Sequence, residues 1–187
     1  MSPSQSPAVH RWTRAEYETL VETGAFERSR VELVDGQIID MAPTSNVHVR
    51  CVSRLHTALV LALPPSEFAV MGQSPFALDE FSEPEPDVVV LRSRADLWQD
   101  GHAQSSDVVL AIEVALSSWA YDSGPKLTAY ARAALPEVWL IDLRQNIVHI
   151  CREPIDGTYT DRHTARPGDT VPVSVTGVTI RVADFLQ

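Results

Sequence analysis

The chain has 187 residues, of which 44% are hydrophobic and 21% are charged, a balance typical of one soluble globular domain. Its formal net charge of −10 at pH 7 argues against a protein whose main role is to coat nucleic acid, because phosphate binding normally leaves a basic surface. The sequence has no apolar run of about 18 residues to span a membrane, and Cys51 and Cys151 stand alone without CxxC spacing, so we expect reduced core cysteines and a cytoplasmic protein.

The N-terminal residues 1–10 lack a basic segment followed by an apolar one, so we expect a disordered lead-in rather than a signal peptide. Residues 11–187 then form a single domain, since no linker or internal repeat divides them. A helix is predicted from Trp12 to Val21, because Thr13 and Glu16 have the spacing of a capping box.

Two alternating stretches on either side of Asp35-Gly36 predict a β-hairpin between Arg30 and Met41. Taken alone, Glu32 in its first strand is most simply an exposed carboxylate. A helix with apolar positions at i, i+3 and i+4 follows from Val47 to Leu63. His48 lies in its first turn, where the helix dipole favours anions, so this side chain either contacts a phosphate or a metal-bound water, or is simply solvated.

Strands are predicted in 68–78, with Gln73 in their middle, and the acidic run 79–85 is expected to be a solvated loop. Two apolar strands come next, 86–91 and 108–114, joined by a surface connection with a short helical piece around 95–98. Each strand carries one carboxylate, Asp87 and Glu113 respectively. An unpaired carboxylate in a buried strand costs several kcal/mol unless a metal, a proton or a cation compensates it, so Glu113 requires a partner.

Lys126 is the only lysine of the chain, beside fourteen arginines. An ammonium group can hold or deprotonate a water, which a guanidinium does not do, so the single lysine is either kept for its chemistry or is a solvated surface residue. We expect a helix from about Ser123, with Pro125 in its first turn and its core face formed by Leu127, Ala131 and Ala134. Lys126 and Tyr130 then share the other face.

The C-terminal part is predicted to be mostly strands. Pro136 ends the preceding helix, and an apolar strand over 137–142 pairs with one over 148–151. Further short strands around 158–164 and 171–175 and a terminal turn over 182–186 complete the domain.

The order of these elements and their residues resembles the Uma2-like family of the PD-(D/E)XK nuclease superfamily, over roughly Trp12 to Phe185. The resemblance rests on four blocks: Glu32 to Ile39, Pro43-Thr44-Ser45 followed by His48, Pro86 to Val90, and Ile112-Glu113-Val114 followed by Lys126 to Asp142. It implies an α/β (α+β) fold with a restriction-endonuclease-like core, in which helices flank a mixed β-sheet, with an N-terminal β-hairpin and a C-terminal β extension.

The resemblance also implies a Mg²⁺-dependent endonuclease that hydrolyses DNA, with Mn²⁺ as the alternative ion. Asp87 and Glu113 would bind the metal with the backbone carbonyl of Val114. Lys126 would orient or deprotonate the attacking water, with Glu32 as an assisting carboxylate, and the substrate-binding rim would consist of His48, Gln73 and Tyr130. Superfamily members often pair to reach both DNA strands, so a homodimer is expected, and a partner protein that supplies DNA affinity is left open.

Two departures from the superfamily pattern keep alternatives open. Ala115 stands where Glu-x-Lys would place the lysine, although Lys126 on the next helix can reach the same water, and the loop 117–121 lacks the arginine expected of a phosphate clamp. The alternatives are a catalytically weak or inactive module for nucleic-acid or protein interaction, and an inert domain in which Lys126 and Glu113 form a structural ion pair.

Overall fold

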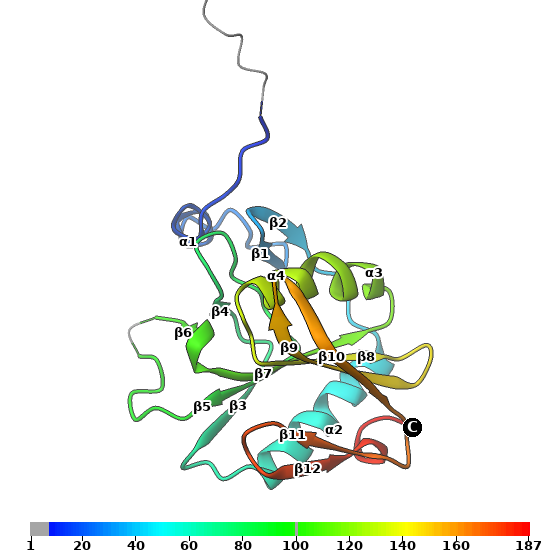
Figure 1. The fold of residues 1–187 in the computed structure, drawn as a ribbon. Coiled ribbons are helices and arrows are strands. Elements are labelled where there is room, and N and C mark those ends of the chain that lie inside the picture. Colours follow the sequence, from blue (N-terminus) through cyan, green and yellow to red (C-terminus); the bar gives the residue numbers. More distant parts are fainter. Residues whose placement is uncertain (1–7, 100) are drawn as a thin grey trace, which may run out of the picture.

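A six-stranded sheet forms the centre of the computed structural model, which describes residues 8–99 and 101–187 (Figure 1). Its strands lie in the order β10-β9-β8-β7-β5-β3. Their bounds are Phe68–Gly72 (β3), Val88–Arg92 (β5), Val108–Ala115 (β7), Glu137–Asp142 (β8), Ile147–Ile155 (β9) and Thr158–Ala165 (β10). The sheet is mixed, because β7 and β8 are parallel and the other neighbouring strands are antiparallel.

The parallel pair β7–β8 of this sheet requires a crossover connection, and this crossover is helical. It consists of α3 (Trp119–Tyr121), a π-helical turn over Asp122–Lys126 and α4 (Leu127–Arg132). The helix predicted from Ser123 is therefore corrected: Pro125 lies within a π-turn, and the helix ends four residues before Pro136, with Ala134 exposed at φ 56° rather than on the core face.

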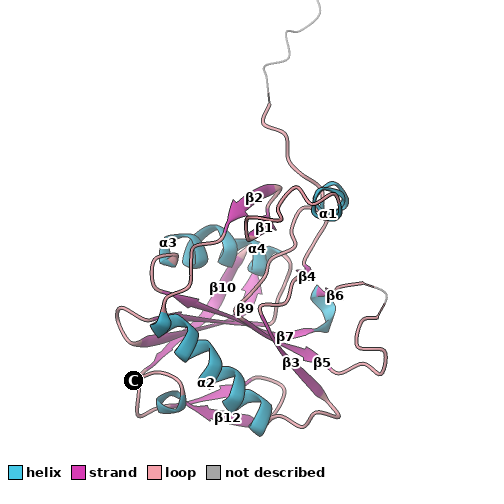
Figure 2. Ribbon diagram, turned by 180° about the vertical axis from the view of Figure 1, so that it is seen from behind, coloured by secondary structure: helices cyan, strands magenta, loops and turns pink. Residues whose placement is uncertain are grey.

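The two faces of the sheet are covered by different elements, as the two opposite views show (Figures 1 and 2). One face packs on α2 (Asn46–Ala62) and on the hairpin of β11 (Thr170–Val173) and β12 (Val178–Arg181). The other face packs on α4, through Leu127 and Tyr130, and this second core extends to Phe76 in β4 (Phe76–Ala77) and to Ala103 in β6 (Ala103–Gln104). Helices thus flank a mixed sheet, as predicted.

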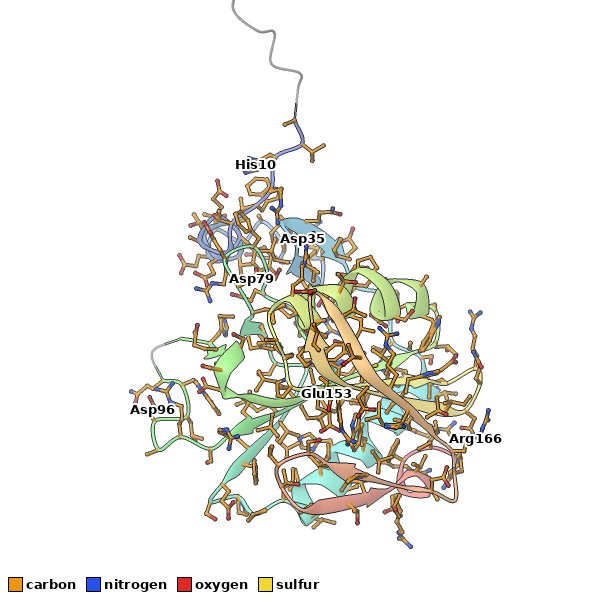
Figure 3. All side chains as sticks on the ribbon, viewed as in Figure 1. His10, Asp35, Asp79, Asp96, Glu153 and Arg166 are labelled. Atoms are coloured by element: carbon orange, nitrogen blue, oxygen red, sulfur yellow. The ribbon has the colours of Figure 1, made fainter. Side chains whose placement is uncertain are left out.

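The N-terminal elements form their own small layer beside α4 (Figure 1). β1 (Val31–Val34) and β2 (Gln37–Asp40) form the predicted hairpin, with Asp35 and Gly36 both at positive φ in the turn. Helix α1 (Arg14–Glu22) starts at the predicted capping box of Thr13 and Glu16. Figure 3 shows His10 and Asp35 at this end of the molecule.

Several local expectations differ from the structure. Residues 95–98 form a turn with Leu97 and Trp98 at positive φ, not a helical piece, and the connection 92–106 contributes strand β6. The acidic run 79–85 is not a solvated loop: Ser82 and Glu83 are buried, because the backbone of Glu83 pairs with Leu33 of β1. β1 is therefore covered on both sides, and Glu32 is buried rather than exposed.

The remaining segments agree with the expected organisation. β9, β10 and the β11–β12 hairpin form the C-terminal extension, and a short 3₁₀ turn over Val182–Asp184 follows them. A second 3₁₀ turn, Ser105–Asp107, precedes β7. The predicted lead-in falls mostly on 1–7, outside the described residues. None of the described helices is both long and apolar enough to cross a membrane.

Candidate active site

A pocket of about 360 Å³ lies where the N-terminal hairpin, α2, β5, β7 and the helical crossover meet. Most of the residues singled out from the sequence line it: Glu32, His48, Gln73, Asp87, Glu113, Val114 and Lys126. Tyr130 lies behind the pocket, completely buried, and reaches it through Glu113. The structure thus brings the other residues proposed for the site into one pocket, from Glu32 to Lys126, whereas Tyr130 supports Glu113 from behind and does not form part of the substrate-binding rim.

The register of the central strands explains why Asp87 and Glu113 meet. Val88 pairs with Ile112 across the antiparallel β5 and β7, so the residue before Val88 lies beside the residue after Ile112. Side chains alternate between the two faces of a strand, and Ala111 belongs to the core on the α4 side, so Glu113 faces the same side. Its carboxylate therefore points toward the crossover that carries Lys126.

Lys126 is the cation that Glu113 requires. Its Nζ lies 2.9 Å from Oε1 of Glu113 and 2.8 Å from Oε2 of Glu32. The lysine is 2% exposed and the two glutamates are 3% exposed, so the three charges compensate one another out of water. Burial acts to lower the pKa of Lys126, but the carboxylates of Glu113, Glu32 and Asp122 outweigh it and raise that pKa, which keeps the amine protonated.

Glu113 is held by Tyr130 as well as by Lys126. The hydroxyl of Tyr130 donates a hydrogen bond of 2.6 Å to Oε1 of Glu113. Burial raises the pKa of Glu113 well above its usual range, although Lys126 opposes this shift. Burial and the same carboxylate also raise the pKa of Tyr130, so the phenol keeps its proton and remains a donor. The site therefore positions Glu113 through one oxygen.

Glu32 enters the site because the hairpin folds over the crossover. Its Oε2 accepts from the backbone N–H of Glu85 at 3.0 Å in addition to contacting Lys126. The carbonyl of Glu85 in turn accepts a long bond of 3.5 Å from Lys126. Glu85, from the segment expected to be a solvated acidic turn, thus lines the pocket.

Asp87 is fixed by α2 and β7. Its Oδ2 accepts from the backbone N–H of Val114 at 2.8 Å and lies 3.1 Å from Nε2 of His48. The hydrogen bond with Asp87 raises the pKa of His48, which favours the protonated imidazole. His48 is therefore half-buried beside a predicted metal ligand and is not a solvated first-turn residue.

Gln73 follows β3 rather than lying inside a strand. It has a φ of 48°, in the left-handed region that a non-glycine residue rarely occupies, and its N–H donates to the carbonyl of Asp87 at 3.1 Å. This hydrogen bond holds Gln73 at the pocket next to Asp87, so the unusual backbone is tied to the site.

The structure adds four residues that the sequence reading missed. Asp122 and Tyr121, from the crossover, and Glu85 and Arg30, from the opposite wall, all line the pocket. Burial raises the pKa of Asp122, while Lys126 opposes the shift. Arg30 forms an ion pair with Glu85. The spacing of Asp122 four residues before Lys126 could have indicated a shared helical face, whereas Arg30 and Glu85 meet only through the tertiary fold.

The carboxylate oxygens of the pocket are possible ligands for a divalent metal. The described chain holds no group of three or more His, Cys, Asp and Glu side chains arranged for a metal. Asp87 and Glu113 each use one carboxylate oxygen in the contacts above, and Oδ1 of Asp87 and Oε2 of Glu113 take part in none of the hydrogen bonds between described residues. Two such oxygens fit Mg²⁺, which is usually held by one or two carboxylates together with waters and substrate phosphates.

Comparisons with known proteins identify the family and the fold of the chain. The model of the family Uma2, described as "Putative restriction endonuclease", matches residues 14–183. Among solved structures, the fold is similar to a putative nuclease belonging to DUF820 from Anabaena variabilis, with a TM-score of 0.69, 17% sequence identity, and coverage of 92% of this chain and 96% of that chain. At this identity the likeness concerns the fold. No curated protein matched the sequence.

Proposed function

Because the chain belongs to the Uma2 family, described as putative restriction endonucleases, we propose that it is a Mg²⁺-dependent endonuclease that hydrolyses phosphodiester bonds of DNA. One observation carries the proposal: a single pocket holds Asp87, Glu113 and Lys126, with the ammonium 2.9 Å from the Glu113 carboxylate. Two carboxylates beside a buried ammonium are a set suited to a metal, a water and a phosphate.

Asp87 and Glu113 would hold the metal through Oδ1 and Oε2, the oxygens not used in the hydrogen bonds between described residues, with the carbonyl of Val114 as a third ligand. The chemistry that bound Mg²⁺ or Mn²⁺ supplies is charge neutralisation at the phosphate and a lowered pKa of a bound water. His48 keeps the other oxygen of Asp87 engaged, as Tyr130 does for Glu113, so each carboxylate has a fixed orientation.

Lys126 would act as a cation rather than as a base. The raised pKa of its amine means that it stays protonated, so it orients the attacking water and stabilises the charge that develops on the phosphate. Glu32 holds the ammonium from the opposite side and thereby positions it. Gln73 and Arg30 line the same pocket and would contact the substrate, and Arg30 is a candidate for the phosphate contact absent from the loop 117–121.

The first test is calorimetric titration of Mg²⁺ and Mn²⁺ into the wild type and Glu113→Gln. We expect binding to the wild type and loss of binding in the variant, because the amide cannot supply an anionic ligand. Affinity should rise with pH, since the pKa of Glu113 is raised and only its carboxylate binds the ion. The matched control is Asp156→Asn, an exposed carboxylate in the β9–β10 turn, which should bind as the wild type does.

Cleavage of plasmid DNA by the same proteins tests the reaction itself. Metal-dependent nicking should be lost in Asp87→Asn and kept in Asp156→Asn. Equal nicking by wild type and Asp87→Asn would contradict the proposal.

A non-catalytic module for nucleic-acid or protein interaction is the second candidate. It is favoured by the net charge of −10 and by a Lys126 whose charge is already matched by two carboxylates. Turnover that is lost in Lys126→Met would reject this alternative, whereas DNA or protein binding without turnover would favour it.

The proposal also includes the oligomeric state of the protein and its location in the cell. A homodimer that reaches both DNA strands and a cytoplasmic location are expected from the family resemblance and from the unpaired, buried Cys51 and Cys151. Sedimentation with and without duplex DNA tests the dimer, and it also reveals whether a partner protein is needed for DNA affinity.

A further inference from the structure

A second and larger cavity, of about 640 Å³, lies on the outer side of the wall that bounds the candidate active site. It opens between α1, the turn after it, the start of β1 and the segment around His102. Arg30 and Glu85 line both cavities, so their ion pair is part of the partition between them. The proposed nuclease function makes no use of this second cavity.

The walls of the cavity combine apolar surfaces with carboxylates. Tyr17, Val21, Phe26 and Val31 supply the apolar part, with the rings of Tyr17 and Phe26 6.1 Å apart. The acidic side chains among the lining residues are Glu18, Glu22, Glu27, Glu83 and Glu85. Such walls suit a ligand with an aliphatic body and a positively charged end.

Glu83 provides the feature that points to a ligand. It is only 5% exposed, yet its Oε2 has no hydrogen-bond partner among the described residues. Its Oε1 lies 3.7 Å from Nε2 of His102, beyond hydrogen-bond range. A buried carboxylate oxygen without a donor is costly, and native proteins rarely leave one unsatisfied. A donor supplied from outside the chain would remove this cost.

The charges around Glu83 leave the cavity negative. Arg14 contacts Glu18 at 3.5 Å, and Arg30 is paired with Glu85, so these two cations are matched. Within the described part of the chain, Glu22 and Glu27 take part in no ion pair, and the basic group within ion-pair distance of Glu83 is His102, which compensates it only when protonated. Burial raises the pKa of Glu83 to about 7, followed by a hydrogen bond with the Glu18 carboxyl group and by the charge of Glu18, against a smaller opposing effect of Arg14. That hydrogen bond exists only while one of the two carboxyl groups holds a proton, so at higher pH the buried oxygen of Glu83 has no donor among the described residues.

We propose that this cavity is a binding site for a guanidinium or ammonium group carried on an aliphatic stem, with Glu83 as the buried acceptor of its N–H donors. The stem would lie against Val21 and Val31, and the cation near the faces of Tyr17 and Phe26, where the aromatic quadrupole adds attraction. A free alkyl guanidine and an arginine side chain of a polypeptide share this chemistry.

The backbone of Glu83 does not depend on its side chain for its position. Its N–H donates to the carbonyl of Leu33 at 2.8 Å, and its carbonyl accepts from the N–H of Leu33 at 3.3 Å. Glu83→Gln keeps the volume of the side chain, so the variant should fold while losing the charge. It is therefore a clean probe of the cavity.

The test is calorimetric titration of agmatine, and of a short acetylated and amidated peptide containing one arginine, into the wild type at about pH 8. The expected result is binding that weakens at least about tenfold in Glu83→Gln, as for loss of a charged hydrogen bond. Tighter binding of agmatine would identify a free alkyl guanidine as the source, and tighter binding of the peptide would identify an arginine side chain. 1,4-Butanediol, which has the same stem without charge, should not bind.

Two comparisons make the result specific. Glu153→Gln, an exposed glutamate on β9 well away from α1 (Figure 3), should bind agmatine as the wild type does. Lowering the pH from about 8 to about 6 should weaken binding to the wild type, because protonation neutralises a carboxylate with a raised pKa. The titratable groups facing Glu83 include Glu18, Arg14 and His102, so the pH effect must disappear in Glu83→Gln to be assigned to it. Absence of binding by both cations, or unchanged binding in Glu83→Gln, would overturn the proposal.

Discussion

Lys126 links the stability of the pocket to its proposed chemistry. Its ammonium compensates the buried carboxylates of Glu32 and Glu113, which contact it from opposite elements. Removing one member of a buried ionic set costs about 3–5 kcal/mol, since the remaining charges are left unpaired. We therefore expect Lys126→Met to lower the free energy of unfolding by about that amount, measured by urea denaturation.

A triple variant separates this structural effect from the catalytic one. Glu32→Gln and Glu113→Gln combined with Lys126→Met remove all three charges, and neutral replacements of a complete buried set are often tolerated. The triple variant should recover much of the lost stability and still fail to cleave DNA. If the single variant were as stable as the wild type, the charges would not be compensating one another.

At the same scale, the sequence singled out Asp87, Glu113 and Lys126, which the structure places in one pocket, but the exposure expected for Glu32 from its own strand was wrong. A carboxylate in an alternating strand looks exposed when only its own strand is considered. The structure buries it, because Glu83 pairs with Leu33 on the other side of β1 and the N–H of the nearby Glu85 donates to the Glu32 carboxylate. This contact joins positions 53 apart in the sequence, and no local pattern reports it.

Among the elements, the strands of the C-terminal half are tied together by a second buried charge. Glu137 of β8 is completely buried and accepts from Nε1 of Trp139 at 2.7 Å, from Arg152 of β9 at 2.6 Å, and from the N–H of Ser174 after β11 at 2.8 Å. Three elements thus share one carboxylate.

Arg152→Met should therefore lower the free energy of unfolding by about 3 kcal/mol, because Glu137 would lose its cation while remaining buried. The matched control is Arg181→Met, whose exposed ion pair with Asp184 should contribute less than about 1 kcal/mol. Urea denaturation of both variants measures the difference, and similar losses in the two would contradict a special role for Glu137. Metal binding by folded Arg152→Met should be unchanged, since neither residue lines the pocket.

Elements with strong local signals were predicted well. The Asp35-Gly36 turn fixed the hairpin, and the capping box and the apolar spacing predicted α1 and α2. The crossover was predicted less well, because a π-turn has no sequence signature of its own. β6 was missed since it is short and pairs with β4, which lies far before it in the chain. β12, the second strand of the hairpin with β11, was also missed.

On the scale of the whole molecule, buried carboxyl groups make stability depend on pH. The pKa of Glu83 rises from 4.5 to about 7 on folding, so between these values the folded protein keeps a proton that the unfolded chain has lost. Stability then falls as pH rises through this window, the reverse of the behaviour of a salt-bridged carboxylate.

The contribution of Glu83 should appear as a loss of about 2 kcal/mol in the free energy of unfolding between about pH 4.5 and about pH 7. It is measured as the difference between the wild type and Glu83→Gln in urea titrations at each pH, which cancels the effects of other groups. Parallel pH profiles for the two proteins would show that Glu83 keeps an ordinary pKa.

Because Lys126 is the single lysine, a lysine-specific protease can cleave this chain at one bond, which lies at the junction of the π-turn and α4. An endoproteinase specific for lysyl bonds can cut this chain only after Lys126, into 1–126 and 127–187, and the native protein hides that bond with a side chain 2% exposed. Digestion should therefore proceed only when the crossover opens, and its rate would report that opening. A ligand that binds in the pocket lined by Lys126 should slow the cleavage. The intensity of the two product bands on a gel would then measure how much of the protein has ligand bound.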